Sequence, residues 1–173
     1  MAHGVVHTTK VGIWDNTTFS FIHTADIDNG YLVSKGALAT GEREIYNATF
    51  DTTAPAFLVA NPAWNYDDDT YIKKYDESTY TNKAGISFRT YELRPYDRFE
   101  VSGDAVDTTL TVGDTVGMGA TGLITKDAIS KFQGKVIGVN QTGFVYSVGT
   151  YGNGVNGTLD TTNTFYLIEV VEN

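Results

Sequence analysis

The chain has 173 residues, of which 41% are hydrophobic and 19% charged, a formal net charge of −9 and no cysteine. Its length suits one domain with its own core, and its composition is that of a globular chain rather than a disordered one. The missing cysteines exclude disulfides, thiolate metal sites and cysteine nucleophiles, and the acidic charge argues against nucleic acid as a partner.

The sequence also speaks against a membrane partner. No apolar run approaches the roughly 20 residues of a membrane span. The first four residues, Met1 to Gly4, lack the charged and apolar regions of a secretion signal. We therefore expect a chain that is made inside a cell and has no membrane contact.

The N-terminal third alternates polar and apolar positions. Residues 1–18 are polar and rich in threonine, which is typical of an arm or a first edge strand, and residues 19–24 continue as a strand. Residues 28–30 (Asp-Asn-Gly) predict a turn, because Asn and Gly accept positive φ at low cost. A short strand at 31–33 and a loop bracketed by glycines at 35–41 are expected to follow.

Two strands and a long loop are predicted next. Residues 44–48 favour a strand, and the continuous apolar run 57–60 favours a strand that is buried on both faces. The segment from Asn65 to Lys83 is the most polar of the chain, and we interpret it as a long exposed loop. Such loops are uncommon in compact domains and often carry function.

The pattern is clearest from Ile86 to Val101. Apolar and polar residues alternate, Pro95 interrupts the ladder, and Phe99 and Val101 start a new strand. Residues 112–116 indicate a turn between strands. Residues Gly122 to Phe132 are the one place where the apolar spacing would allow a short helix. Residues 134–139, 143–148 and 164–171 predict closing strands around a loop at 149–163.

These elements predict an all-β fold. Most connections are too short for a crossover helix, so the sheet should be largely antiparallel. We expect a small antiparallel β-barrel or sandwich with long loops and an extended N-terminal arm. The arm would comprise residues 1–25 and the single β domain residues 26–173.

Candidate cofactor and metal motifs have simpler explanations. Residues 117–122 match G-x-G-x-x-G, but residues 139–141 (Val-Asn-Gln) hold no acid where a dinucleotide site needs one, and residues 152–157 match the pattern again. We interpret both as turns. His3 and His7 would bind a metal only on a helix, and Asp67 to Asp69 lack the spacing of a helix–loop–helix calcium site. We therefore predict no cofactor and no metal.

No catalytic motif is present either. The chain holds no G-x-S-x-G elbow, H-E-x-x-H pair or phosphate-binding loop. We therefore predict no catalytic residues and a protein that is not an enzyme. Two carboxylates that act together on a sugar need proximity in space only, so a glycan hydrolase remains an open alternative.

Exposed aromatic residues are the candidates for partner contact. Several tyrosines lie in the polar 65–83 segment, where a core role is least expected. The alternative is that their rings pack flat on a sheet edge. The residues expected to contact a partner are Trp14, Phe19, Trp64, Tyr66, Tyr71 and Tyr75.

Three stretches together carry a family resemblance. They are residues 29–33 with 41–48 (NGYLV and GEREIYNA), residues 57–62 (FLVANP) before Tyr66-Asp67, and residues 89–102 (RTYEL to DRFEVS) before VGDTV at 112–116. This order, with the closing strand 168–171, resembles capsid decoration (cement) proteins of tailed bacteriophages of Gram-positive hosts. The segment before Asn29 does not take part in it.

The resemblance implies a function. Such proteins sit on the outer surface of the assembled capsid and reinforce contacts between major capsid protein subunits. It implies a structural virion protein, made in the cytoplasm of the host bacterium, that binds the shell as a homo-oligomer, for example a trimer. A tail or baseplate adhesin that binds host glycans is the alternative, and the tyrosine-rich loop is the feature that would favour it.

Overall fold

The computed structural model describes residues 3–11, 18–63, 77, 80–142, 145–148, 157–160 and 163–173. Strands and connecting loops make up nearly all of this part of the chain, and its one named helical element is a single 3-10 turn, η3 (Gly103–Ala105). The predicted all-β fold is confirmed. No described residues form a helix with the length and apolar character to cross a membrane.

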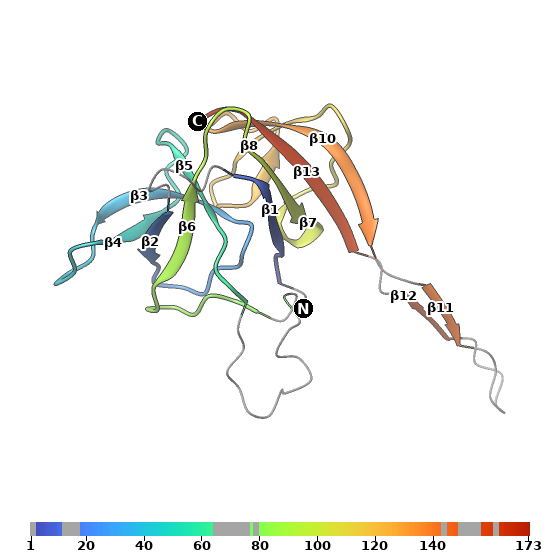
Figure 1. Cartoon of the computed structure of the whole chain (residues 1–173), viewed down its shortest axis with the longest axis horizontal. Helices are drawn as coiled ribbons and strands as arrows, with labels where there is room; N and C mark the ends of the chain where they lie inside the picture. Colours follow the sequence, from blue (N-terminus) through green and yellow to red (C-terminus); the bar gives the residue numbers. More distant parts are fainter. Residues whose placement is uncertain are drawn as a thin grey trace.

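One unit of the fold is a six-stranded sheet (Figure 1). All its neighbouring strands are antiparallel. The first strand of the chain forms one edge of the sheet, which agrees with the prediction of an arm or first edge strand for residues 1–18. In spatial order the strands are β1 (Val6–Lys10), β7 (Arg98–Ser102), β13 (Asn163–Glu172), β10 (Gln133–Thr142), β8 (Thr115–Met118) and β9 (Ile124–Lys126).

The second unit is a closed ring of five strands, called the barrel below. The β2–β4 pair is parallel, and every other strand pair in the described part of the chain is antiparallel, as the short connections predict. Around the ring the order is β2 (Thr18–Ile22), β4 (Ile45–Thr49), β3 (Leu32–Leu38), β5 (Ala56–Val59) and β6 (Phe88–Glu92).

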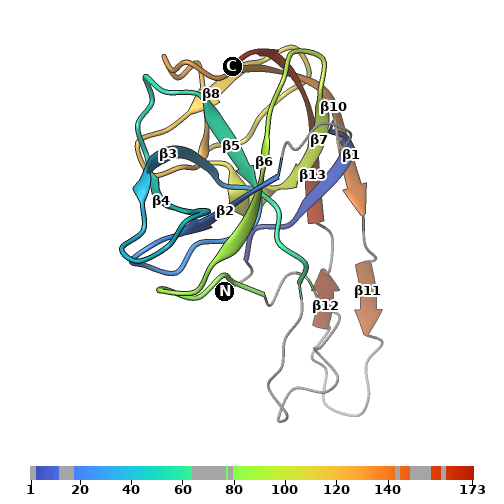
Figure 2. The same ribbon diagram turned by 60° about the vertical axis from the view of Figure 1, so that its left-hand side comes forward.

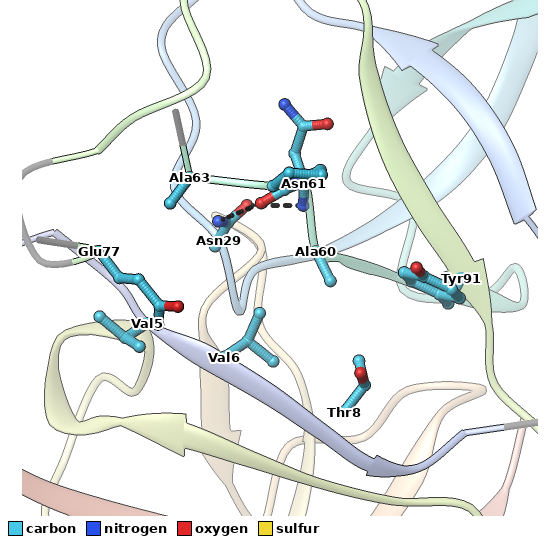
Figure 3. A pocket seen from close by; sticks show the side chains of 10 residues that line it. Val5, Val6, Thr8, Asn29, Ala60, Asn61, Ala63, Glu77 and Tyr91 are labelled. Carbon is cyan, nitrogen blue, oxygen red and sulfur yellow. Dashed lines mark hydrogen bonds between the residues drawn. The ribbon is translucent and has the colours of Figure 1, made fainter. Parts of the chain in front are cut away.

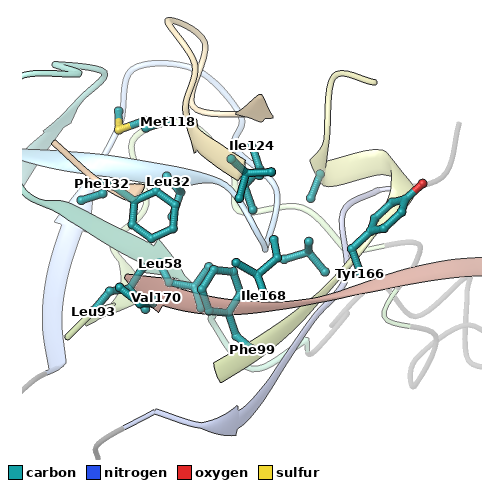
Figure 4. Close-up of a cluster of buried hydrophobic side chains, with 14 of the residues drawn as sticks. Leu32, Leu58, Leu93, Phe99, Met118, Ile124, Phe132, Tyr166, Ile168 and Val170 are labelled. Carbon is teal, nitrogen blue, oxygen red and sulfur yellow. The ribbon is translucent and has the colours of Figure 1, made fainter. Parts of the chain in front are cut away.

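Strands β3 and β5 separate two hydrophobic cores. Consecutive residues of a strand face opposite sides, and here both sides are apolar. Leu32 and Leu58, which pair across the strands, face the core of the six-stranded sheet (Figure 4), whereas Val33 and Phe57 face the core of the barrel. Strand β5 is buried along its whole length, as its continuous apolar run predicts.

A two-stranded ribbon extends from the sheet. Strands β11 (Val145–Val148) and β12 (Gly157–Asp160) lie beyond the ends of β10 and β13 and project away from the body (Figures 1 and 2). Thr142 pairs with Asn163 and Val145 with Asp160, which lies three residues further along in both strands. The β11–β12 pair therefore has the same register as the β10–β13 pair.

The segment predicted as an N-terminal arm holds two strands that are integrated into the fold. β1 pairs with β7, and β2 pairs with both β4 and β6. The backbone N–H of Val5 also donates to the hydroxyl of buried Ser102 at 2.9 Å, which fixes the start of β1.

Three local predictions are wrong. Residues 35–41 do not form a loop throughout, because β3 continues to Leu38 with a register shift between Lys35 and Leu38. Residues 122–132 hold strand β9 rather than a helix, since positive φ at Gly122 and Asp127 interrupts helical geometry on both sides of the strand. The loop predicted at 149–163 contains strand β12.

Candidate functional site

A cavity of about 210 Å³ lies between β1 and the barrel (Figure 3). Val6 and Thr8 line it from β1, Asn61 and Tyr91 line it from the barrel side, and Glu77 supplies a carboxylate. The cavity therefore lies at the base of the segment 64–79, which begins just after Ala63, another lining residue.

An asparagine cluster, formed by Asn29, Asn61, Tyr80 and Asn82, borders this cavity. The Nδ2 of Asn29 donates to the carbonyl of Asn61 at 2.9 Å, and the backbone N–H of Asn61 donates to the Oδ1 of Asn29 at 3.0 Å. The Nδ2 of Asn61 donates to the Tyr80 hydroxyl at 2.7 Å, and that hydroxyl donates to the Oδ1 of Asn82 at 3.2 Å. Asn82 closes the cluster through its Nδ2, which lies 3.2 Å from the Oδ1 of Asn29.

The cluster fixes both ends of the polar segment. Asn61 stands before the segment and Tyr80 after it, and both are tied to Asn29 or to Asn82, which are buried. No buried side-chain nitrogen or oxygen in the described residues lacks a hydrogen-bond partner. Because unpaired buried amides are costly, a fully satisfied cluster of this kind holds a single arrangement.

The chain after the cluster is held by Asp26. The backbone N–H of Ala84 donates to its Oδ1 at 2.9 Å, and the ammonium of Lys83 lies 3.0 Å from its Oδ2. These two contacts, the Ala84 hydrogen bond first, lower the pKa of the Asp26 carboxyl from its ordinary value. The predicted contact segment thus ends at a well-defined anchor.

His7 joins the outer face of the sheet to Glu77. Its ring stacks on Phe165, with ring centroids 5.1 Å apart and an interplanar angle of 15°. Its Nε2 lies 3.5 Å from a carboxylate oxygen of Glu77, and its Nδ1 lies 3.6 Å from one of Glu100. The imidazole therefore packs between an aromatic ring and two acids.

A second hollow, of about 240 Å³, lies at one end of the barrel and is lined by Thr18, Phe19, Ser20, Glu44 and Tyr46. We call it the barrel mouth. Strands β2 and β4 are parallel and both begin here, which brings Phe19 and Tyr46 together with their ring centroids 6.4 Å apart. The ammonium of Lys35, from β3, lies 3.9 Å from the centroid of the Tyr46 ring and 5.0 Å from that of Phe19.

Of the predicted contact residues, the structure places Phe19. It is half-buried in the barrel mouth, where its ring meets Phe57 edge-on at 5.2 Å. The other predicted contact residues lie outside the described residues, and so does the acidic run at 67–69. They are Trp14, Trp64, Tyr66, Tyr71 and Tyr75.

The structure describes residues 117–122 and the two N-terminal histidines. Residues 117–122 run from β8 into a turn before β9, in which the backbone N–H of Gly122 donates to the carbonyl of Gly119 at 3.0 Å. His3 and His7 are not on a helix, and the Nδ1 of His3 lies 3.0 Å from the carboxylate of Asp28. In the described part of the chain, no three His, Asp or Glu side chains are placed to hold a metal ion.

The sequence interpretation missed the asparagine cluster and the position of Lys35. Asn29 and Asn61 stand in Asn-Gly and Asn-Pro dipeptides, which indicate turns and conceal any buried role for the amide. Lys35 lies in the predicted loop 35–41, but β3 continues through Gly36, and this continuation places Lys35 beside Tyr46.

Comparisons with known proteins leave the family open. No protein-family model, curated protein sequence or solved structure matches the chain.

Proposed function

We propose that this chain is a structural virion protein without enzymatic activity, which decorates and stabilises the outer surface of a bacteriophage capsid by binding major capsid protein subunits. The sequence resemblance to decoration proteins motivates the proposal. The structural observation that carries it is the ribbon formed by β10 to β13, which supplies an interaction element on a stiff body.

The composition of the ribbon supports a docking role. Between Lys135 and Glu169 the chain has one charged residue, Asp160, although 19% of all its residues are charged. Burial of a charge on binding costs free energy, so a neutral ribbon docks with little desolvation penalty. Most of the net charge of −9 is thus carried by the rest of the chain, which suits an outer surface and disfavours contact with packaged DNA.

The backbone of the ribbon offers a second means of association. β7 pairs with β13 only as far as the Ser102–Phe165 pair, and β8 pairs with β10 only as far as Lys135. Among the described strands, β11 and β12 pair with each other alone. Exposed strand edges are templates for pairing with another chain, which supports binding to capsid subunits and to further copies as a homo-oligomer.

The size of the ribbon also suits this role. Strand β11 has four residues, which span about 13 Å at the usual rise per residue, and it lies beyond the end of β10 (Figure 1). An element of that length reaches beyond the body to a neighbouring subunit, while the two cores keep the body rigid.

A shortened ribbon tests the proposal. Asn140 pairs with Phe165, so an Asn-Gly dipeptide that joins them closes a two-residue hairpin and keeps the register of the body. We expect this variant to fold. When it is mixed with phage capsids from which the natural protein is missing and the capsids are sedimented, the variant should stay in the supernatant. The full chain should pellet with those capsids.

The matched control shortens a turn elsewhere. Replacing residues 40–43 by Asn-Gly shortens the connection between β3 and β4, which lies on the side of the molecule away from the ribbon (Figure 1). This variant should still bind capsids. Equal binding by both variants would contradict a role for the ribbon, and capsids whose resistance to heat and low salt is unchanged by the chain would contradict the proposed function. Particle images that place the chain on the tail would favour the adhesin instead.

A further inference from the structure

A cation lies on two aromatic rings, Phe19 and Tyr46, that also line the barrel mouth. The ammonium of Lys35 lies 3.9 Å from the centroid of the Tyr46 ring and 5.0 Å from that of Phe19, within the range in which the negative ring face attracts a cation. Within the described residues, this ammonium has no ion pair and no hydrogen-bond acceptor of its own. The two ring faces hold it in place.

The rings themselves are fixed. Phe19 and Phe21 both contact Phe57, at centroid distances of 5.2 and 5.3 Å, and Tyr46 lies 6.1 Å from Phe21. These contacts belong to the barrel core, in which Phe21 is fully buried. The aromatic surface is therefore preorganised, whereas Lys35 is an exposed side chain on a flexible stem.

The space beside the rings is suited to a cation from outside. The mouth measures about 240 Å³, and the exposed Glu44 contributes a carboxylate to its wall next to the hydroxyl residues Thr18 and Ser20. Mouths of β-barrels are common ligand sites, and two aromatic rings with an acid form the usual environment for an alkylammonium group.

We propose that the barrel mouth is a binding site for an alkylammonium group, and that Lys35 occupies the rings until such a ligand displaces it. The site lies at β2, β3 and β4, on the side of the molecule away from the ribbon (Figures 1 and 2). If the ribbon did not bind capsids, this proposal would therefore be unaffected. If the barrel mouth did not bind an alkylammonium group, the proposed capsid binding by the ribbon would likewise be unaffected.

Two probes distinguish the possible sources of the group. Tetramethylammonium chloride represents a quaternary head group, which uses ring faces and charge but donates no hydrogen bond. N-acetyl-lysine amide represents the side chain of a partner protein, which can also donate to Glu44, Thr18 and Ser20. Amide chemical-shift titrations of the full chain, at matched ionic strength with sodium chloride, report where each probe binds.

The variant Lys35→Met gives the sharpest result. If Lys35 competes for the rings, its removal should tighten binding of the better probe several-fold, whereas a Lys35 that contacts the ligand directly would make the same variant bind more weakly. Glu44→Gln should weaken binding, and Glu42→Gln, at an exposed acid that does not line the mouth, should leave it unchanged. All three positions are exposed, so the fold should be preserved.

Binding of either probe, with shifts at residues 18–20, 35 and 44–46, supports the proposal and identifies the source of the group. The proposal is overturned if neither probe moves these resonances more than sodium chloride does. It is equally overturned if Lys35→Met weakens or does not alter the binding of a probe.

Discussion

Buried amides hold the base of the segment 64–79. Asn29 is 6% exposed and Asn82 is 3% exposed, and each makes hydrogen bonds to more than one neighbour. An amide offers both donors and acceptors without the desolvation cost of a charge. The cluster can therefore join three separate parts of the chain in a buried position.

We expect Asn29→Ala to lower the free energy of unfolding by about 2–3 kcal/mol, because it leaves the Asn61 backbone N–H without an acceptor and removes one of the two acceptors of the Asn82 amide. Urea denaturation measures the change. Asn47→Ala is the control, since Asn47 is exposed and its amide donates to the carbonyl of Ala37 at 3.1 Å. Its cost should stay below about 1 kcal/mol, and equal costs at the two positions would contradict a structural role for the cluster.

Asp114 supplies a pH-dependent contact at the start of β8. The ammonium of Lys126 lies 2.9 Å from its Oδ1, and the backbone N–H of Thr111 donates to its Oδ2 at 2.8 Å. These contacts, Lys126 first, hold the pKa of the Asp114 carboxyl below its ordinary value. A lowered pKa means that the contribution to stability is present above the unfolded-state pKa of about 4 and is lost as the pH falls through the folded-state value.

Asp114→Asn should therefore be less stable than the natural chain at pH 7, and the difference should shrink as the pH falls below about 4. Thermal unfolding followed by circular dichroism across that range measures both effects. Glu42→Gln, at an exposed acid, controls for the loss of one negative charge. A difference that stays constant into strong acid would show that the Asp114 carboxylate is not the titrating group.

At the scale of elements, the pattern of apolar residues along the sequence is a reliable guide to the strands, and glycine is not. The burial of β5 and the break at Pro95 follow from sequence because both depend on local pattern. Gly36 indicated a loop, yet it lies within β3, where an added Cβ would come within 2.7 Å of the carbonyl oxygen of Asn47. Glycine is needed at this position because the neighbouring strand approaches closely. Only the tertiary structure reveals this contact.

The predicted helix fails for a related reason. The apolar residues from Leu123 to Phe132 have helical spacing, but Ile129 is 96% exposed and Phe132 is fully buried, so they do not share a face. Among the site residues, Phe19 followed from the alternation of β2. Lys35 and the asparagine cluster did not, because their roles depend on contacts between residues distant in the sequence.

Gly122 and Gly41 form a matched pair, because both have a φ of +83°. Around Gly41 an added Cβ meets no atom within 4 Å, whereas at Gly122 it would lie 2.5 Å from the Phe50 ring and 2.8 Å from the carbonyl oxygen of Leu32. We expect Gly41→Ala to cost about 1–2 kcal/mol from backbone strain alone. Gly122→Ala should cost about 2 kcal/mol more, because it also displaces packed atoms.

Chemical denaturation of the two variants measures this difference directly. A smaller difference than about 1 kcal/mol would mean that the turn before β9 relaxes away from Phe50, and that the contact between this turn and β3 is not rigid.

At the scale of the whole molecule, the two cores share one wall. The backbone N–H of Leu32 also donates to the carbonyl of Gly122 at 2.8 Å, so β3 is hydrogen-bonded to a turn of the sheet unit as well as to the barrel. Phe50 packs against both cores. Separation of the barrel from the sheet would therefore expose Leu32 and Leu58 to water, at a cost of about 1.5–3 kcal/mol for each side chain.

We accordingly expect the body to unfold in one cooperative transition. Native-state hydrogen exchange should give the same free energy of opening for the slowest amides of β5 in the barrel and of β13 in the sheet, because neither unit keeps its core once the shared wall is lost. Val59→Ala removes methyl groups from the barrel core and Val116→Ala from the sheet core. Each should lower the opening free energy of both sets of amides by the same amount, about 1–3 kcal/mol. If Val59→Ala lowered only that of the barrel, the two units would be independently stable, and the rigid connection between barrel mouth and ribbon would not exist.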